Sequence, residues 1–243
     1  MLASRWRPFP HGEGESKGRG DYVSEADRAS EDAILGVLRE RSPGVAILAE
    51  ESGGTRADLM WAVDPLDGTT NFLHGMPVVG VSVGLLDRGH PVLGAVLAPF
   101  LGLEFTGGGG RGVRLNGRLM PALRARAPER AIVGTAPPFR HKERWARYGR
   151  VMEAVFQRVE DLRRAGAASV DLAWVASGTQ DAFFELGLAP WDVAAGAALV
   201  LAAGGAVTDW AGGQDWLWTG DVLAAAPGVH EALLEAAAQA PPG

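Results

Sequence analysis

Five acidic residues stand where a carboxylate is costly, at the ends of apolar stretches or at the start of an apolar helix. They are Glu50, Glu51, Asp64, Asp67 and Asp192. Strand ends in layered α/β folds open toward the ligand crevice, and carboxylates that gather there repel one another unless a cation lies between them. Oxygen ligands without a neighbouring histidine or cysteine favour Mg²⁺, Mn²⁺ or Ca²⁺ over zinc. The pattern therefore predicts a site for a hard divalent cation.

The segment that begins at Asp64 reads Asp-Pro-Leu-Asp-Gly, and a turn there allows both of its carboxylates to reach one ion. Proline, aspartate and glycine are also favoured in simple turns, so this segment alone supports a plain turn equally well. The next residues, Thr69, Thr70 and Asn71, add hydroxyls and backbone N–H groups. If a helical turn begins there, its free N–H groups can receive phosphate. Acidic ligands followed by such a cradle indicate metal-assisted phosphoryl transfer.

Short apolar strands must position these side chains at their ends, and amphipathic helices must cover the strands. Ser24 can cap a helix, with Asp27 completing a start that resembles a capping box. The apolar spacing predicts that one face of this helix is buried, at Ala26, Ala29, Ala33, Ile34, Val37 and Leu38. Strands are expected over residues 45–49, 59–63, 78–86, 92–98, 103–106, 112–115, 131–135, 161–163, 181–185, 206–208 and 222–225. Further helices are expected over residues 144–159, 169–177, 191–203 and 230–238.

Strands and helices mix in both halves of the chain without a long linker, which indicates an α/β or α+β fold in layers. No composition shift marks a domain boundary, so residues 1–243 are expected to form a single domain. Residues 1–16 are rich in glycine, proline and arginine, and we expect an irregular N-terminal arm there.

The composition narrows the class of protein. The 243-residue chain has a net charge of −6 and no cysteine, which excludes disulfides, iron–sulfur clusters and thiolate zinc sites. Its arginines are scattered, which argues against a broad nucleic-acid footprint. The start has no apolar run typical of a signal peptide, and the longest uncharged apolar stretch, residues 193–207, is shorter than the ~20 residues that span a bilayer. We expect a cytoplasmic protein that binds neither membrane nor nucleic acid directly.

Four segments together resemble the inositol monophosphatase family. Residues 61–72, WAVDPLDGTTNF, are similar to its signature, and residues 49–52, AEES, are similar to its Gly-Glu-Glu segment. Residues 191–196, WDVAAG, resemble its C-terminal signature, and residues 17–27 resemble its N-terminal lysine and acidic helix start. The four segments follow the family's order along most of the chain, which makes the resemblance specific.

The resemblance implies the αβαβα sandwich of the magnesium-dependent, lithium-sensitive sugar phosphatases, a homodimer, and two to three Mg²⁺ ions. The implied metal ligands are Glu50, Asp64, the carbonyl of Leu66, Asp67 and Asp192. The implied phosphate contacts are Gly68, Thr69 and Thr70. The implied catalytic residues are Glu50, Thr69 and Asp64, with the first two orienting the attacking water. The implied contacts to the alcohol are Gly166, Ala167, Ala168, Glu185 and Asp192.

The reaction that this resemblance implies is hydrolysis of inositol 1-phosphate by in-line attack of a metal-activated water. Ala167 stands where inositol-preferring members often carry a hydroxyl residue, so a broader sugar phosphatase, similar to fructose 1,6-bisphosphatase, is one alternative. A nucleotide phosphatase is another, although those branches more often carry lysine in place of Thr70. An alternative of a different class is a transcription-associated factor that binds RNA polymerase, for which Arg163 and Arg164 are a candidate surface.

Overall fold

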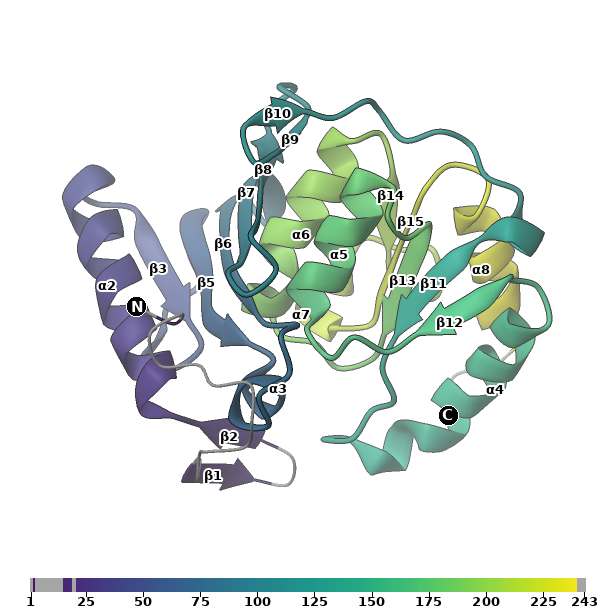
Figure 1. Cartoon of the computed structure of the whole chain (residues 1–243), viewed down its shortest axis with the longest axis horizontal. Helices are drawn as coiled ribbons and strands as arrows, with labels where there is room; N and C mark the ends of the chain where they lie inside the picture. Colours follow the sequence, from purple (N-terminus) through teal and green to yellow (C-terminus); the bar gives the residue numbers. More distant parts are fainter. Residues whose placement is uncertain (1, 3–14, 19–20, 240–243) are drawn as a thin grey trace.

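A computed structural model of the chain describes residue 2, residues 15–18 and residues 21–239. Helices and sheets alternate in five layers (Figure 1), which confirms the αβαβα arrangement that the resemblance implied. The expected irregular arm over residues 1–16 lies mostly outside the described residues. Its last two residues begin strand β1 (Glu15–Gly18), which pairs with β2 (Asp21–Val23) in a small antiparallel ribbon.

The larger sheet has eight strands in the order β10-β9-β8-β7-β6-β5-β3-β4. Their bounds are β3 (Ala46–Ala49), β4 (Gly53–Gly54), β5 (Leu59–Asp67), β6 (Gly80–Asp87), β7 (His90–Ala98), β8 (Leu103–Gly108), β9 (Val113–Leu115) and β10 (Arg118–Leu119). Strands β3 and β5 run parallel, and all other neighbours in the sheet are antiparallel. The register of β5 against β6 shifts between Asp64 and Asp67, so the chain bulges at the acidic segment predicted for the site.

The smaller sheet has five strands in the order β12-β11-β13-β15-β14. Their bounds are β11 (Ile132–Thr135), β12 (Asp161–Arg163), β13 (Ala182–Glu185), β14 (Ala206–Thr208) and β15 (Val222–Ala225). Strands β12, β11 and β13 run parallel, so their carboxyl ends meet at one edge. Helices α4 (Trp145–Phe156) and α8 (His230–Ala238) pack together on the outer face of this sheet (Figure 1). All of these strands and helices were predicted, with small shifts at their ends.

The middle layer consists of α5 (Ala168–Ser177) and α6 (Pro190–Ala202), which lie between the two sheets (Figure 1). Helix α6 lies directly on the backbone of the larger sheet because both surfaces carry small residues. A Cβ atom added to Gly84 of β6 would lie 2.6 Å from the backbone nitrogen of Ala195. A Cβ atom on Gly94 of β7 would collide with the carbonyl of the same alanine. The glycines of the strands and the alanines of α6 thus permit this close approach.

Helix α2 (Glu25–Arg41) covers the outer face of the larger sheet next to β5 and begins as predicted, with a capping box formed by Ser24 and Asp27. The predicted buried face is partly wrong, since Ala33 is exposed and Val37 is 57% exposed. The fully buried positions of this helix are Ala26, Asp27, Ser30, Glu31 and Leu35. The reason is that Ser30 and Glu31 meet backbone groups of the loops at the strand ends, while Ala26 packs on Leu66 and Val79.

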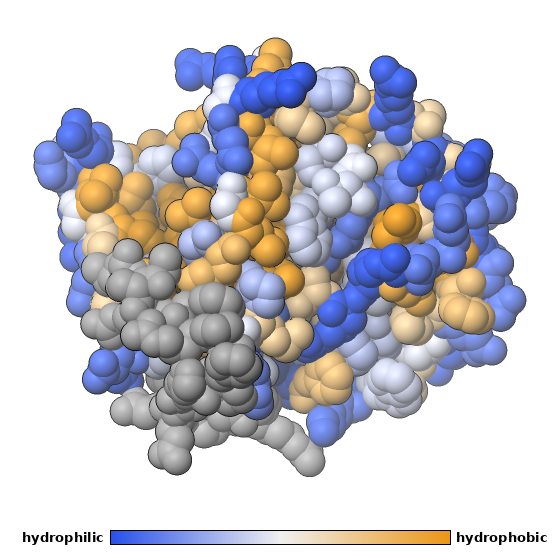
Figure 2. Space-filling view, in the orientation of Figure 1, coloured by the Kyte–Doolittle hydropathy of each residue, from blue (hydrophilic) through white to orange (hydrophobic). Residues whose placement is uncertain are grey.

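The described structure also has two short α-helices, α3 (Thr69–Leu73) and α7 (Trp216–Thr219), and two 3₁₀ helices, η1 (Pro128–Arg130) and η2 (Lys142–Arg144). Helix α3 is the helical turn that was predicted after the acidic segment, whereas α7 was not expected. Figure 2 shows an apolar band over the larger sheet, and Leu93 and Leu97 of β7 are exposed on the face opposite to α6. Among the helices in the described part of the chain, none is long and apolar enough to cross a membrane.

Candidate active site

A cavity of about 150 Å³ lies where strands of both sheets end and where α3, α5 and α6 begin. Segments far apart in the sequence form its walls, and they include residues 64–71 next to the larger sheet and residues 136–141 next to the smaller. Every residue that the resemblance implied for the site lines this cavity: Glu50, Asp64, Leu66, Asp67, Gly68, Thr69, Thr70, Gly166, Ala167, Ala168, Glu185 and Asp192. Glu51, the neighbour of Glu50, is not among the residues that line it.

Four carboxylates crowd one side of the cavity. Burial raises the pKa of Asp64 well above its ordinary value, and the charges of Glu50, Asp67 and Asp192 raise it further. Burial also raises the pKa of Asp67 to about 7, and the charge of Asp192 adds to this shift. Among the described residues, no three acidic, histidine or cysteine side chains form a ready ligand cluster. The carboxylates therefore share a cavity and repel one another without meeting at a point.

Hydrogen bonds fix the orientation of three of these carboxylates. The backbone N–H and the hydroxyl of Ser169 donate to Oδ2 of Asp67 at 2.7 and 2.6 Å. The N–H of Leu66 donates to Oδ1 of Asp64 at 2.9 Å, and the N–H of Ala189 donates to Oδ2 of Asp192 at 2.7 Å. Ser169, which is fully buried, was missed by the sequence reasoning. Its contact joins residues 102 positions apart, so no local spacing points to it.

The buried polar face of α2 holds the loops that carry the acidic residues, and its part in the site was also missed. Asp27 accepts a hydrogen bond from the hydroxyl of Thr69 at 3.0 Å. The hydroxyl of Ser30 donates to the carbonyl of Pro65 at 2.8 Å. Glu31 accepts the backbone N–H groups of residues 51 and 52, directly after Glu50, at 2.9 and 2.8 Å. Polar residues at helical spacing after Ser24 were the signal for this role.

The proposed phosphate cradle is built around Gly68, whose φ of 88° belongs to the left-handed region that favours glycine. A Cβ atom there would lie 3.1 Å from the carbonyl of Val78 and 3.2 Å from that of Gly166. Asn71 ties the turn to both walls, because its amide donates to the carbonyls of Val78 and Ala165 at 2.7 and 2.9 Å. Thr69 and Thr70, at the start of α3, line the cavity, and the first N–H groups of a helix have no partner within it.

The opposite wall comes from the smaller sheet and combines apolar and charged residues. Its apolar part includes Ala136, Pro137 and Pro138 of the loop after β11. Burial raises the pKa of Glu185 well above its ordinary value, and the charge of Asp171 raises it further. Three basic side chains, Arg140, His141 and Arg164, also line this wall. They had not been predicted for the cavity.

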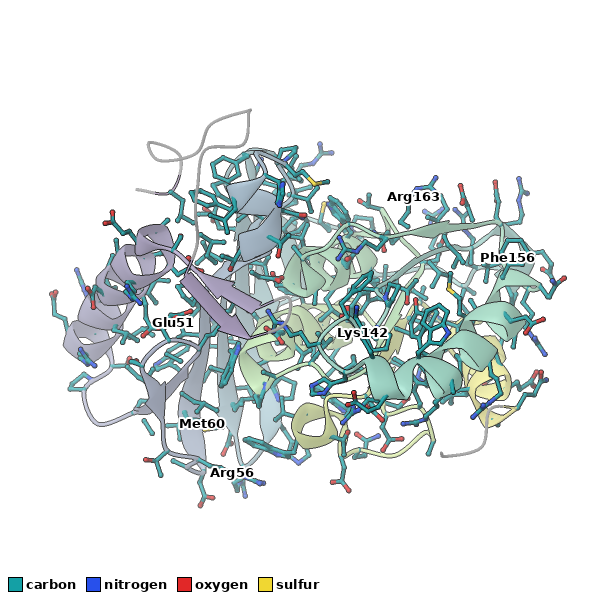
Figure 3. All side chains as sticks on the ribbon, turned by 90° about the horizontal axis from the view of Figure 1, so that it is seen from below. Glu51, Arg56, Met60, Lys142, Phe156 and Arg163 are labelled. Carbon is teal, nitrogen blue, oxygen red and sulfur yellow. The ribbon has the colours of Figure 1, made fainter. Side chains whose placement is uncertain are left out.

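The two arginines considered as a partner surface in the sequence analysis have different surroundings. Arg163 pairs with Asp161 at 2.5 Å on the exterior of β12 and points away from the molecule (Figure 3). Arg164 lies in the wall of the cavity, with its guanidinium 5.5 Å from the ring centroid of Phe139. Both arginines are exposed, but of the two only Arg164 lines the cavity.

The layered fold, with a carboxylate-lined cavity beside a left-handed glycine turn, is the architecture that the sequence resemblance had implied. The sequence profile of the Inositol monophosphatase family matches residues 1–241. The chain belongs to this family.

Individual relatives carry two kinds of name. The chain is 40% identical to the Nus factor SuhB of Escherichia coli (strain K12) over 237 residues, which covers 96% of this chain and 89% of that protein. It is 42% identical to the inositol-1-monophosphatase of Mesorhizobium japonicum over 224 residues, which covers 90% of this chain and 84% of that protein. The crystal structure of extragenic suppressor protein suhB from Bartonella henselae is similar at a TM-score of 0.87 and 37% identity, covering 93% of this chain and 89% of that one.

Proposed function

We propose that this chain hydrolyses small phosphomonoesters in a magnesium-dependent reaction, and that inositol 1-phosphate is among its substrates. The observation that carries the proposal is the placement of Glu50, Asp64, Asp67 and Asp192 in one cavity beside the turn at Gly68. The name of the inositol-1-monophosphatase relative, at 42% identity, supports the substrate.

The proposed metal ligands are Glu50, Asp64, the carbonyl of Leu66, Asp67 and Asp192, which would hold two to three ions. An all-oxygen donor set fits Mg²⁺. Burial and then the charges of neighbouring carboxylates raise the pKa values of Asp64 and Asp67, and a divalent cation would relieve the repulsion between these charges. When bound, Mg²⁺ polarises the phosphoryl oxygens and lowers the pKa of bound water.

The chain's own residues position the reactants. The N–H groups of Gly68, Thr69 and Thr70 are proposed to hold the phosphate oxygens, where they stabilise the charge of a loose transition state. Glu50 and the hydroxyl of Thr69 are proposed to orient the attacking water. That hydroxyl is held by Asp27 and by the carbonyl of Leu66, at 3.0 and 3.1 Å, so little reorganisation is needed when the water attacks. Asp64 completes the proposed catalytic set.

The alcohol part of the substrate is proposed to contact Gly166, Ala167, Ala168, Glu185 and Asp192. Ala167 is buried and offers no hydroxyl, which supports a pocket that accepts more than one alcohol. A broader sugar phosphatase and a nucleotide phosphatase are therefore alternatives that would use the same metal-dependent hydrolysis.

Phosphate release tests the proposal. The panel contains inositol 1-phosphate, fructose 1,6-bisphosphate and a 3′-nucleotide, each with Mg²⁺. We expect release that EDTA abolishes and excess Mg²⁺ restores. No release from any of these esters over a range of Mg²⁺ concentrations, or release that EDTA does not affect, contradicts the proposal.

A second candidate function is a transcription-associated role through binding to RNA polymerase. The 40% identity to a protein named Nus factor SuhB, over 96% of this chain, favours it. Such a role is compatible with hydrolysis. Binding of purified bacterial RNA polymerase to the immobilised chain tests it, with an unrelated protein of similar charge as the control. Equal binding to both surfaces rejects this role.

A further inference from the structure

The cavity has a basic side that neither the proposed metal ligands nor the phosphate cradle explains. Arg140 and Arg164 line it, with His141 beside them. Arg140 lies in the loop after β11, and Arg164 directly follows β12. Because β11 and β12 are parallel neighbours, the segments that follow them leave the smaller sheet at the same edge. Two cationic side chains therefore reach the cavity from one wall, opposite the carboxylates on the larger sheet.

Arg164 lies against the part of the site proposed to contact the alcohol. A Cβ atom added to Gly166 would lie 2.8 Å from Nη1 of Arg164, so the guanidinium occupies the space directly beside this glycine. The guanidinium carbon also lies 5.5 Å from the ring centroid of Phe139, within cation–π distance. The guanidinium therefore lies near both an aromatic ring and the glycine backbone at the edge of the alcohol pocket.

The charge of Arg164 reaches the interior of the cavity. Burial and three neighbouring carboxylates raise the pKa of Glu185, and Arg164 lowers it.

Apart from Glu185 and the basic residues, most of the side chains on this wall are apolar. Ala136, Pro137, Pro138, Ala167 and Leu188 line it, and none of these side chains has a polar group. Hydroxyls of a neutral sugar that face such side chains lose their hydrogen bonds to water without compensation. A guanidinium instead matches the geometry of carboxylate and phosphate groups, which it binds through paired hydrogen bonds.

We propose that Arg140 and Arg164 form a subsite for a second anionic group, so that the preferred substrates are small phosphomonoesters whose alcohol part carries another phosphate or a carboxylate. The inference rests on the proposed phosphatase function and specifies its substrate class. Inositol 1-phosphate, which has no second anionic group, is then a poorer substrate than an ester of similar size that has one.

Two matched pairs of esters test this subsite. Glycerol 2-phosphate is compared with 2-phosphoglycerate, which adds a carboxylate, and fructose 1-phosphate is compared with fructose 1,6-bisphosphate, which adds a phosphate. The measured quantity is the ratio of kcat/KM within each pair, with Mg²⁺ in excess. The proteins are the wild type, Arg164→Gln, Arg164→Lys and the matched control Arg163→Gln. Arg163 is exposed, pairs with Asp161 and points outward (Figure 3).

We expect the wild type to prefer the doubly anionic ester by at least about tenfold in one pair, as for a charge-assisted hydrogen bond. Arg164→Gln lowers this ratio about tenfold, mainly through KM, whereas Arg164→Lys keeps part of it and Arg163→Gln keeps all of it. The pair that responds identifies the anionic group as carboxylate or phosphate. A wild-type ratio near one in both pairs, or a ratio that is unchanged in folded Arg164→Gln, overturns the inference. Failure to hydrolyse all four esters and inositol 1-phosphate overturns the proposed function itself.

Discussion

Asp27 has two separable tasks in this structure, and a pair of variants distinguishes them. Its Oδ2 accepts the N–H and the hydroxyl of Ser24 at 2.7 and 2.5 Å, which closes the capping box of α2. Its Oδ1 accepts the hydroxyl of Thr69 at 3.0 Å, which fixes a group proposed to orient the attacking water. Asp27→Asn keeps the shape of the side chain but removes its charge, so both tasks are weakened together. Ser24→Ala weakens the cap and leaves the bond to Thr69.

The contacts of Asp27 set the expected losses of stability and of activity. Loss of a cap costs about 1 kcal/mol, which in a chain of this size lowers the melting temperature by about 2–4 °C. Hydrogen bonds to a charged group contribute about 1.5–3 kcal/mol, and loss of a residue that orients a ligand costs about 10–100-fold in activity. We therefore expect Asp27→Asn to lose about 10–100-fold in kcat. Ser24→Ala is expected to lose about as much free energy of unfolding as Asp27→Asn, but less than about threefold in kcat.

The assay combines steady-state phosphate release with thermal unfolding for both variants and the wild type. If Ser24→Ala loses as much kcat as Asp27→Asn, the effect comes from fraying of α2 and the proposed role of Asp27 at Thr69 is wrong. If folded Asp27→Asn keeps wild-type kcat, the hydroxyl of Thr69 needs no fixed partner and the reasoning is refuted as well.

Three further predictions concern the buried and cavity-lining carboxylates and the metal that they are proposed to bind. Glu50 lines the cavity and Glu51 does not, so Glu50→Gln is expected to lower kcat/KM far more than Glu51→Gln. If a Mg²⁺ titration of turnover shows the reverse order, Glu50 is not the glutamate that acts in the cavity. LiCl is expected to inhibit hydrolysis in the presence of Mg²⁺ while NaCl at equal ionic strength does not, and equal inhibition by both salts indicates simple screening. In metal-free protein, the free energy of unfolding is expected to fall as pH rises from about 4 to about 7. Asp171 and Asp67 have pKa values of about 7 in the folded state. Over this pH range the folded chain therefore keeps protons that the unfolded chain has lost. The buried Asp171 alone contributes a slope of up to about 1.4 kcal/mol per pH unit, and denaturant unfolding in EDTA that is independent of pH over this range contradicts the shifts.

The predictions from sequence succeeded where the signal was local. Apolar stretches located the longer strands of both sheets, whereas the short strands β1, β2, β4 and β10 were not predicted. The segment at Asp64 placed a turn, a helix start and two carboxylates in one region of twelve residues, which the structure describes as a bulge followed by α3. Ser24 and Asp27 gave the start of α2 because a capping box spans only four residues.

The contacts that were missed are long-range or depend on what a helix packs against. Ser169 reaches Asp67 across 102 positions, and the buried face of α2 is polar because it meets loop backbone at Ser30 and Glu31. Arg140 and Arg164 reach the cavity only because β11 and β12 lie side by side. Helical spacing after Ser24 indicates a polar face, but spacing along the chain identifies none of these partners, which required the fold.

The central claim is that carboxylates in this cavity hold Mg²⁺ for hydrolysis of a phosphomonoester. The most direct measurement is a Mg²⁺ titration of phosphate release from inositol 1-phosphate by the wild type and by Asp67→Asn, with circular dichroism to verify folding. The account predicts saturable, Mg²⁺-dependent release by the wild type and a loss of at least about a hundredfold in kcat/KM for the folded variant, since that carboxylate is both a proposed ligand and fixed by Ser169. Release by folded Asp67→Asn within threefold of the wild type, at the same Mg²⁺ concentration, would contradict it.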